Sequence, residues 1–342
     1  MRKVPVQDAI GLALGHDISE ISGERRLKRR AFRRGHIVAA DDIERLRDLG
    51  KSQIYVWEDG DTDVHEDDAA LAVAPRVAGD GIEHDAEPCE GKITFRATRR
   101  GVLRIDADRL LAINSLGPAA LPTLPTAYPV TAGQTVAAFR IVPLTCTGDE
   151  LDAMLAALVT PLITVEPYVA HTAAILVTGS EVYEGRIEDG FVPRLTTTLA
   201  AHEVPVVASE IVPDERDRIA DAVTRLADRC DLLLVTGGTS VDPDDVTAAA
   251  MADAGVSIDV QGLPIQPGNN LTLGRLGDVP VVAVPAAALF FQATALDLLL
   301  PRLLAGERFT RETVAPMGLG GLAQPGTDDH FPNSTFGAGG WR

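Results

Sequence analysis

The chain has 342 residues, a length that suits two or three domains. Hydrophobic residues make up 46% of the composition and charged residues 23%, so the chain can bury sizeable cores and does not belong to the disordered class. Its 31 Lys and Arg face 49 Asp and Glu, and the resulting net charge of −18 argues against general binding to nucleic acid or to an anionic membrane.

The cysteines and the longest uncharged run bear on the cellular location. Cys89, Cys146 and Cys230 lie far apart and form no disulfide framework or local zinc motif, which is typical of a reducing compartment. The uncharged run Val279–Leu296 contains two prolines, and we interpret it as a strand followed by a buried helix. We therefore expect a cytoplasmic protein without a membrane partner.

Three segments precede the most informative part of the chain. Residues 1–57 form an N-terminal module in which Asp41–Leu49 has the pattern of a capped helix. Residues 58–89 begin with seven acidic residues in eleven positions, and charge repulsion predicts an acidic linker there. Residues 90–169 alternate short extended runs with Pro and Gly, which predicts a β-rich or α+β module.

Residues 170–306 have the pattern of an α/β domain. Apolar strands at Ala173–Val177, Leu232–Val235 and Val279–Val284 alternate with helical stretches, among them one at 214–228 capped by Asp214. Strands that are apolar throughout indicate a mostly parallel sheet covered on both faces, and such sheets bind ligands at the carboxyl ends of their strands. The Gly-rich tail 307–342 has no periodicity, and we expect it to be flexible.

The turn after Val235 carries the strongest binding signal. Gly237 and Gly238 allow a tight turn that brings backbone N–H groups close to a ligand, and Thr239 and Ser240 add hydroxyl donors. Acidic residues up to Asp245 repel a bare phosphate unless Mg²⁺ lies between them. The alternative is a glycine turn in which an aspartate only caps the next helix.

A second polar turn follows the first strand of the same sheet. It holds Thr178, Gly179, Ser180 and Glu181, and it should adjoin the first turn. Asp189 stands just before a helix, and taken alone it is best explained as an N-cap.

These segments resemble a known family. Ile187–Pro193, Ile211–Glu215 and Thr236–Ser240 with Asp245–Thr247 are similar in order and spacing to the molybdopterin-binding domain shared by molybdopterin adenylyltransferase and molybdopterin molybdenumtransferase. Val6–Asp17 and Gly133–Leu144 resemble segments of the second enzyme. The resemblance implies an α/β, three-layer molybdopterin-binding domain preceded by smaller α+β or β-rich modules.

The resemblance also implies the site. Asp189 and Asp245 match the two aspartates expected to be catalytic and to hold Mg²⁺. The residues expected to bind the substrate are Thr178, Gly179, Ser180, Glu181, Asp214, Gly237, Gly238, Thr239, Ser240, Thr247, Pro267 and Gly268. The implied ligands are molybdopterin, its adenylated form and molybdate, and we expect a homo-oligomer.

Two loops depart from the family pattern. Where molybdenumtransferases have Pro-Gly-Lys-Pro and Pro-Gly-Asn-Pro, this chain has Pro267-Gly-Asn-Asn270 and Pro285-Ala-Ala-Ala288. A cationic donor for molybdate is therefore missing, and Arg275 or the basic run 25–34 could replace it. The sequence predicts a molybdenumtransferase-like enzyme with weak molybdate insertion. A molybdopterin carrier or sensor without turnover, and a nucleotide hydrolase that shares the domain, stay open as alternatives.

Overall fold

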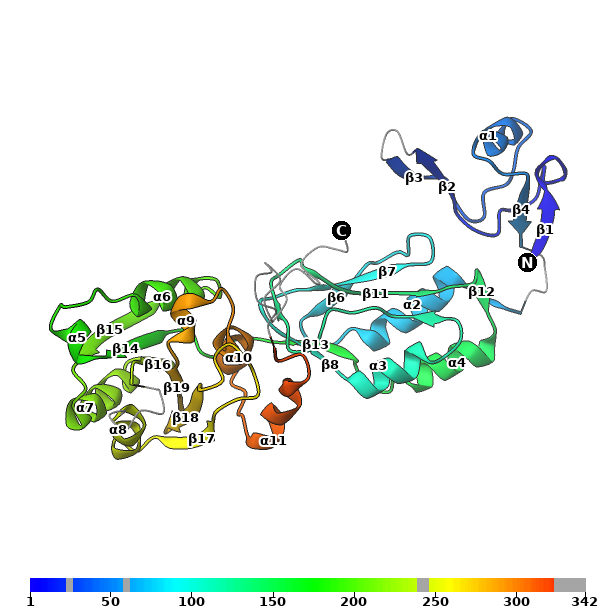
Figure 1. Cartoon of the computed structure of the whole chain (residues 1–342). Coiled ribbons are helices and arrows are strands. Elements are labelled where there is room, and N and C mark those ends of the chain that lie inside the picture. Colours follow the sequence, from blue (N-terminus) through cyan, green and yellow to red (C-terminus); the bar gives the residue numbers. More distant parts are fainter. Residues whose placement is uncertain (23–26, 58–61, 239–245, 323–342) are drawn as a thin grey trace. The chain divides into compact units, whose positions relative to one another are not determined.

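A computed structural model describes residues 1–22, 27–57, 62–238 and 246–322 of the chain (Figure 1). The contacts divide it into two compact units. The first unit comprises residues 1–98, 105–124 and 132–164. The second unit comprises residues 99–104, 125–131 and everything from 165 onward.

The N-terminal part of the first unit is a small α+β fold. Strand β1 pairs antiparallel with β4, and β2 pairs antiparallel with β3. Its buried side chains include Val6, Leu14 and Leu46. The elements are β1 (Arg2–Pro5), η1 (Val6–Asp8), β2 (Ile18–Ser22), β3 (Leu27–Phe32), α1 (Asp42–Asp48) and β4 (Gln53–Val56).

The basic run 25–34 is partly neutralised within this fold. Arg30 Nε lies 3.2 Å from the Asp17 carboxylate, and Arg29 lies 2.8 Å from that of Glu20. Arg25 and Arg26 lie outside the described residues.

The expected linker at 58–89 is wrong for the residues that the structure describes. Residues 62–89 contain β5 (Val64–His65), α2 (Glu66–Val77) and β6 (Ile82–His84). Helix α2 buries Ala69, Ala70 and Val73 completely. Its three acidic residues, 66–68, occupy the first turn, where the positive end of the helix dipole favours them. The last three residues of the acidic run thus mark a helix N-terminus.

The rest of the first unit is built around antiparallel strands. One sheet has the order β6-β7-β11-β9, and a second has the order β10-β8-β13. The elements are β7 (Ile93–Ala97), β8 (Gly101–Ile105), α3 (Ala107–Asn114), β9 (Ala119–Ala120), β10 (Pro129–Val130), β11 (Thr135–Ile141), β12 (Thr145–Cys146), α4 (Gly148–Ala156) and β13 (Ile163–Glu166). Strand β10 lies wholly in the second unit, and β8 and β13 are divided between the two units.

Glu66, the first residue of α2, is a buried carboxyl group. Its side chain is 5% exposed and lies 3.2 Å from the guanidinium of Arg140. Burial raises the pKa of Glu66 to about 7, although Arg140 opposes this shift. Folded Glu66 therefore holds a proton between pH 4.5 and 7 that the unfolded chain has released, so stability is present at low pH and is lost as pH rises.

We expect Glu66 to lower the free energy of unfolding by roughly 1–3 kcal/mol as pH rises through this window. Glu66→Gln should flatten the pH profile, because the neutral amide does not titrate. Chemical denaturation across the window measures the effect, and Glu83→Gln on the surface of β6 is the control. If the stability of Glu66→Gln depends on pH as the wild type does, Glu66 is ionised in the folded protein.

The second unit contains a six-stranded mixed sheet of order β15-β14-β16-β19-β18-β17. Strands β14, β15, β16 and β19 are parallel, while β18 is antiparallel to both of its neighbours. The strands are β14 (Ala173–Thr178), β15 (Val206–Val212), β16 (Leu232–Thr236), β17 (Ser257–Gln261), β18 (Thr272–Leu276) and β19 (Val279–Val284). The helices are α5 (Ser180–Tyr183), α6 (Phe191–Ala200), α7 (Arg216–Ala227), α8 (Thr247–Asp253), α9 (Ala287–Phe290), α10 (Ala295–Leu304), α11 (Arg311–Val314) and η2 (Ala315–Gly318).

The central strands are buried on both faces. In β14, Ile175 and Val177 pack in one apolar cluster with α6 and α10, whereas Ala174 and Leu176 pack in a second cluster with α7 and α8. This alternation follows from the two-residue period of a strand. Figure 1 shows α6, α9 and α10 on one side of the sheet and α7 and α8 on the other. The three-layer α/β fold predicted from the sequence is confirmed.

Residues 307–322 are ordered parts of this domain, so the expectation of a flexible tail is wrong there. Phe309 and Val314 are buried in its core, and Arg311 donates hydrogen bonds to the carbonyls of Gln261 and Gly262. Residues 323–342 lie outside the described part of the chain. No helix among the described residues is long and apolar enough to cross a membrane.

Candidate ligand site at the carboxyl edge of the sheet

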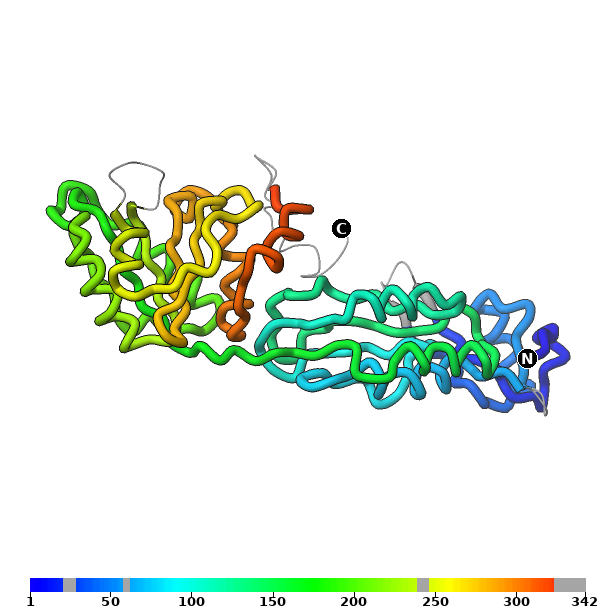
Figure 2. Tube along the Cα trace, turned by 90° about the horizontal axis from the view of Figure 1, so that it is seen from below, coloured from blue at the N-terminus to red at the C-terminus, as the bar shows by residue number. Residues whose placement is uncertain are grey.

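The predicted site residues follow strands that end at one edge of the sheet. Because β14, β15, β16 and β19 are parallel, their carboxyl ends lie together, along the upper edge of the green-to-orange region in Figure 2. Strand β17 runs in the same direction as β19, since β18 is antiparallel to both. The connection 262–271, with Pro267 and Gly268, therefore leaves the same edge.

Three of the predicted residues meet at the base of the Gly237 turn. Thr247 Oγ1 donates to the carbonyl of Gly237 at 3.1 Å and lies 3.3 Å from Thr178 Oγ1. Both threonines are buried. Gly237 has φ +88, and a Cβ there would lie 1.9 Å from the carbonyl oxygen of Thr178. Glycine is required both by this backbone conformation and by this close approach.

The loops after β14 and β15 are joined by a reciprocal pair of hydrogen bonds. The Ser180 amide donates to Asp214 Oδ2 at 2.8 Å, and the Asp214 amide donates to Ser180 Oγ at 3.1 Å. The Gly179 amide also donates to the carbonyl of Val212. Helix α7 begins at Arg216 with Glu215 at its N-cap, so the expected cap at Asp214 is wrong. Asp214 instead holds the first turn of α5.

Asp214→Ala should leave the Ser180 amide without its acceptor and free this turn. We expect a loss of about 1 kcal/mol in local stability, because the site is exposed to water. Amide hydrogen exchange at Ser180 should become about fivefold faster, and exchange in β16 should stay unchanged. Asp221→Ala, an exposed carboxylate in the middle of α7, is the matched control. Equal exchange in both variants would contradict the assigned role.

Asp189 caps helix α6 with both carboxylate oxygens. Oδ1 accepts from the Phe191 amide at 2.8 Å, and Oδ2 accepts from the Val192 amide at 3.0 Å. The simpler explanation of Asp189, a helix cap, is therefore present in the structure. Each oxygen keeps a further lone pair, so the carboxylate can still contact a ligand or a cation.

The other member of the expected catalytic pair, Asp245, lies outside the described residues, as do Thr239 and Ser240. Gly238 is described and has φ +51. Within the described ranges, no group of three or more His, Cys, Asp or Glu side chains could hold a metal ion.

Pro267 and Gly268 contact the start of α10. The Ala295 amide donates to the Pro267 carbonyl at 3.0 Å, and a Cβ on Gly268 would lie 3.0 Å from the Ala295 nitrogen. The Thr294 hydroxyl and the Asp297 carboxylate form a capping box at this helix. These two loop residues thus contact the helix that follows β19, while the Gly268 carbonyl accepts from the Leu271 amide within the loop.

Arg194 is a residue that sequence reasoning missed. From α6 it donates to three carbonyls around the end of α9: Ala288 at 3.1 Å, Phe291 at 3.2 Å and Gln292 at 2.8 Å. These partners stand more than 90 positions away, so no local pattern could have indicated them. Arg194 ties the helix capped by Asp189 to the connection that follows β19.

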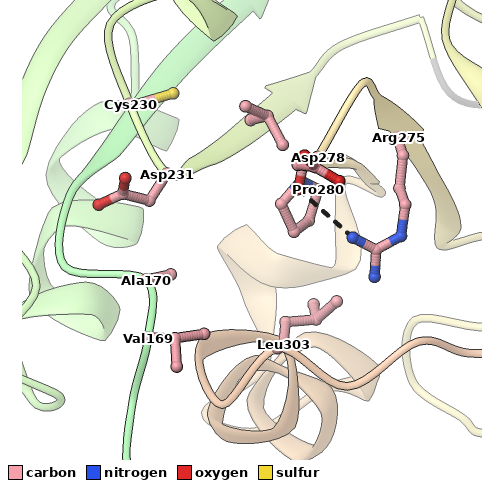
Figure 3. A pocket seen from close by; sticks show the side chains of 10 residues that line it. Val169, Ala170, Cys230, Asp231, Arg275, Asp278, Pro280 and Leu303 are labelled. Atoms are coloured by element: carbon pink, nitrogen blue, oxygen red, sulfur yellow. Dashed lines mark hydrogen bonds between the residues drawn. The ribbon is translucent and has the colours of Figure 1, made fainter.

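Arg275 is at the opposite edge of the sheet, so its suggested role as a molybdate donor is wrong. It pairs with Pro280 at the start of β19 and lines a cavity of about 230 Å³ together with Cys230 and Asp231, which precede β16 (Figure 3). Its guanidinium lies 3.4 Å from the Asp278 carbonyl and 3.6 Å from the Asp259 carboxylate. Its positive charge therefore lies at the edge where the parallel strands begin, away from their carboxyl ends.

The second unit is an α/β domain whose polar, glycine-bearing turns gather at the carboxyl ends of parallel strands, an arrangement typical of ligand-binding domains. Residues 174–305 match the family model described as a probable molybdopterin binding domain. This match supports a molybdopterin-binding domain in this part of the chain. Residues 3–58 match a domain of unknown function (DUF8806).

Curated relatives match parts of the chain. A CinA-like protein of Desulfosudis oleivorans is 44% identical over 82 residues, which are 24% of this chain and 20% of the relative. A putative molybdopterin biosynthesis protein of Methanocaldococcus jannaschii is 36% identical over 72 residues, 21% of this chain and 18% of the relative. The matched segments thus span about a fifth of each relative.

Solved structures are similar at low identity. A molybdopterin biosynthesis enzyme MoaB of Thermus thermophilus is 24% identical with a TM-score of 0.34, covering 41% of this chain and 99% of its own. A molybdopterin biosynthesis MoeA protein of Pyrococcus horikosii is 13% identical with a TM-score of 0.34, covering 89% of this chain and 74% of its own.

Proposed function

We propose that this protein binds molybdopterin at the carboxyl edge of the β14–β19 sheet and acts in molybdenum cofactor biosynthesis as a molybdopterin molybdenumtransferase-like enzyme. The reaction would transfer molybdate to adenylated molybdopterin and release AMP. The observation that supports the proposal most is the Gly237 turn packed against Thr178 within a domain of the molybdopterin-binding family.

Each described residue would contribute through binding or positioning. The Thr247 hydroxyl donates a hydrogen bond to the carbonyl of Gly237, and this bond would fix the backbone of the turn before the ligand binds. The Ser180–Asp214 pair fixes the neighbouring loop in the same way. Such preorganisation favours transfer reactions, in which positioning and charge neutralisation carry most of the catalysis.

A magnesium ion is part of the proposal, with Asp189 and Asp245 as its ligands. Asp189 fits because its oxygens keep free lone pairs after capping α6. When bound, Mg²⁺ would neutralise the charge of the phosphate groups. We further propose a cytoplasmic location and self-association.

A molybdopterin carrier or sensor without turnover is the second candidate. Asn269, Asn270 and Ala286–Ala288 favour it, because neutral amides and backbone groups bind an oxyanion more weakly than a cation does. The position of Arg275 at the opposite edge removes one source of compensation.

The two candidates differ in molybdate-dependent release of AMP from adenylated molybdopterin in the presence of Mg²⁺. The enzyme should release AMP upon addition of molybdate, whereas a carrier should bind the ligand without releasing AMP. Nucleotide cleavage in the absence of any pterin would favour a hydrolase that shares the domain. The assay should use the full chain, including its N-terminal modules.

A further inference from the structure

Two exposed aromatic side chains stand in the connection that follows β19. Phe290, the last residue of α9, is 77% exposed, and Phe291 is 47% exposed. Aromatic residues make up only 4% of the chain. Burying a phenylalanine side chain contributes about 2–3 kcal/mol, so two adjacent rings left in water forgo a large stabilisation. Exposed apolar groups of this kind mark interaction sites when they cluster.

The backbone of this connection is held firmly although its rings are exposed. The carbonyls of Ala288, Phe291 and Gln292 accept hydrogen bonds from Arg194, and the Phe291 amide donates to the carbonyl of Ala287. The rings therefore project from a fixed support, which keeps the entropic cost of binding low.

The connection that carries the rings starts next to the proposed ligand site. Thr236 at the end of β16 pairs with Val284 at the end of β19, so the connection carrying Phe290 starts beside the Gly237 turn. On the other side, a Cβ on Gly190 would lie 3.4 Å from the side chain of Leu289. Figure 1 shows α9 beside α6, the helix that Asp189 caps.

We propose that Phe290 and Phe291 form an aromatic subsite that stacks on the planar heterocycle of the ligand. The inference rests on the proposed function and assigns the recognition of the ring to residues outside the glycine turns. A net charge of −18 makes an uncharged contact suitable, because stacking does not depend on the sign of the protein field. The heterocycle is either the pterin itself or the adenine of the adenylated form.

The test compares Phe290→Ala with the wild type in equilibrium binding of molybdopterin and of ATP. Stacking of one base on one aromatic side chain contributes about 1–3 kcal/mol, so we expect the affinity for the stacked ligand to fall at least about fivefold. Phe290→Tyr keeps a ring and should bind within about twofold of the wild type. A loss for molybdopterin alone identifies the pterin as the stacked ring, and a loss for ATP alone identifies adenine.

Leu319→Ala is the matched control, because Leu319 is 95% exposed in the same unit. Unchanged affinities in Phe290→Ala, or an equal loss in Leu319→Ala, would overturn the subsite while leaving wild-type binding intact. A change of oligomeric state with unchanged affinities would also overturn it, since the rings would then be covered by a second copy. Failure of the wild type to bind either ligand would instead refute the proposed function together with the subsite.

Discussion

Gly237→Ala should destabilise the second unit by about 3 kcal/mol or more and abolish ligand binding. The new Cβ would lie 1.9 Å from the Thr178 carbonyl oxygen, so the two central strands cannot both keep their positions. Alanine at φ +88 adds backbone strain. Chemical denaturation, together with hydrogen exchange in β14 and β16, measures the loss.

Gly277→Ala separates the steric collision from the backbone strain. Gly277 has φ +61 in the turn between β18 and β19, but a Cβ there meets nothing within 4 Å. We expect this control to lose only about 1 kcal/mol, since it carries the backbone strain without the collision. Similar losses in both variants would mean that Thr178 does not approach Gly237 as closely as the structure shows.

Asp189→Asn should lower the stability of the second unit by about 1 kcal/mol. An asparagine can keep one of the two hydrogen bonds to α6, but its NH₂ group then faces the other amide, which is also a donor. Thermal unfolding and hydrogen exchange at Phe191 and Val192 measure the effect. Glu188→Gln, the neighbouring exposed carboxylate, controls for the loss of charge.

Binding assays of the same variant test its proposed functional role. If Asp189 also holds Mg²⁺, molybdopterin affinity should lose its dependence on Mg²⁺ in Asp189→Asn and keep it in Glu188→Gln. Lower stability with unchanged affinity would assign Asp189 to capping alone. Unchanged stability would contradict the hydrogen bonds described here.

The sheet of the second unit could be predicted because its pattern is local. Ile175 and Val177 pack on one face and Ala174 and Leu176 on the other, so the strand is apolar throughout, which is the pattern of a doubly covered parallel strand. The glycine turns at its carboxyl edge follow from the same logic. The capping role of Asp189 could also be predicted, because an aspartate before an apolar helical stretch is typical of a helix N-terminus.

Two helix boundaries and the contacts between loops could not be predicted in this way. The start of α2 could not be predicted from the acidic run up to Asp68, because a helix N-terminus and a solvated linker can have the same acidic composition. The buried helix expected after the strand in the uncharged run Val279–Leu296 is interrupted at Phe291, and the Thr294–Asp297 capping box is the sequence signal of its second start. The contacts of Arg194 and the Ser180–Asp214 pair could not be predicted, because they join loops that only the folded sheet brings together.

The most direct test of the account is equilibrium binding of molybdopterin to the full chain, followed by the absorbance or fluorescence of the pterin. The account predicts saturable binding that Gly237→Ala abolishes and Gly277→Ala preserves. Absence of binding at tens of micromolar protein, or equal binding by the wild type and a folded Gly237→Ala variant, would contradict the assignment of the carboxyl edge as the molybdopterin site.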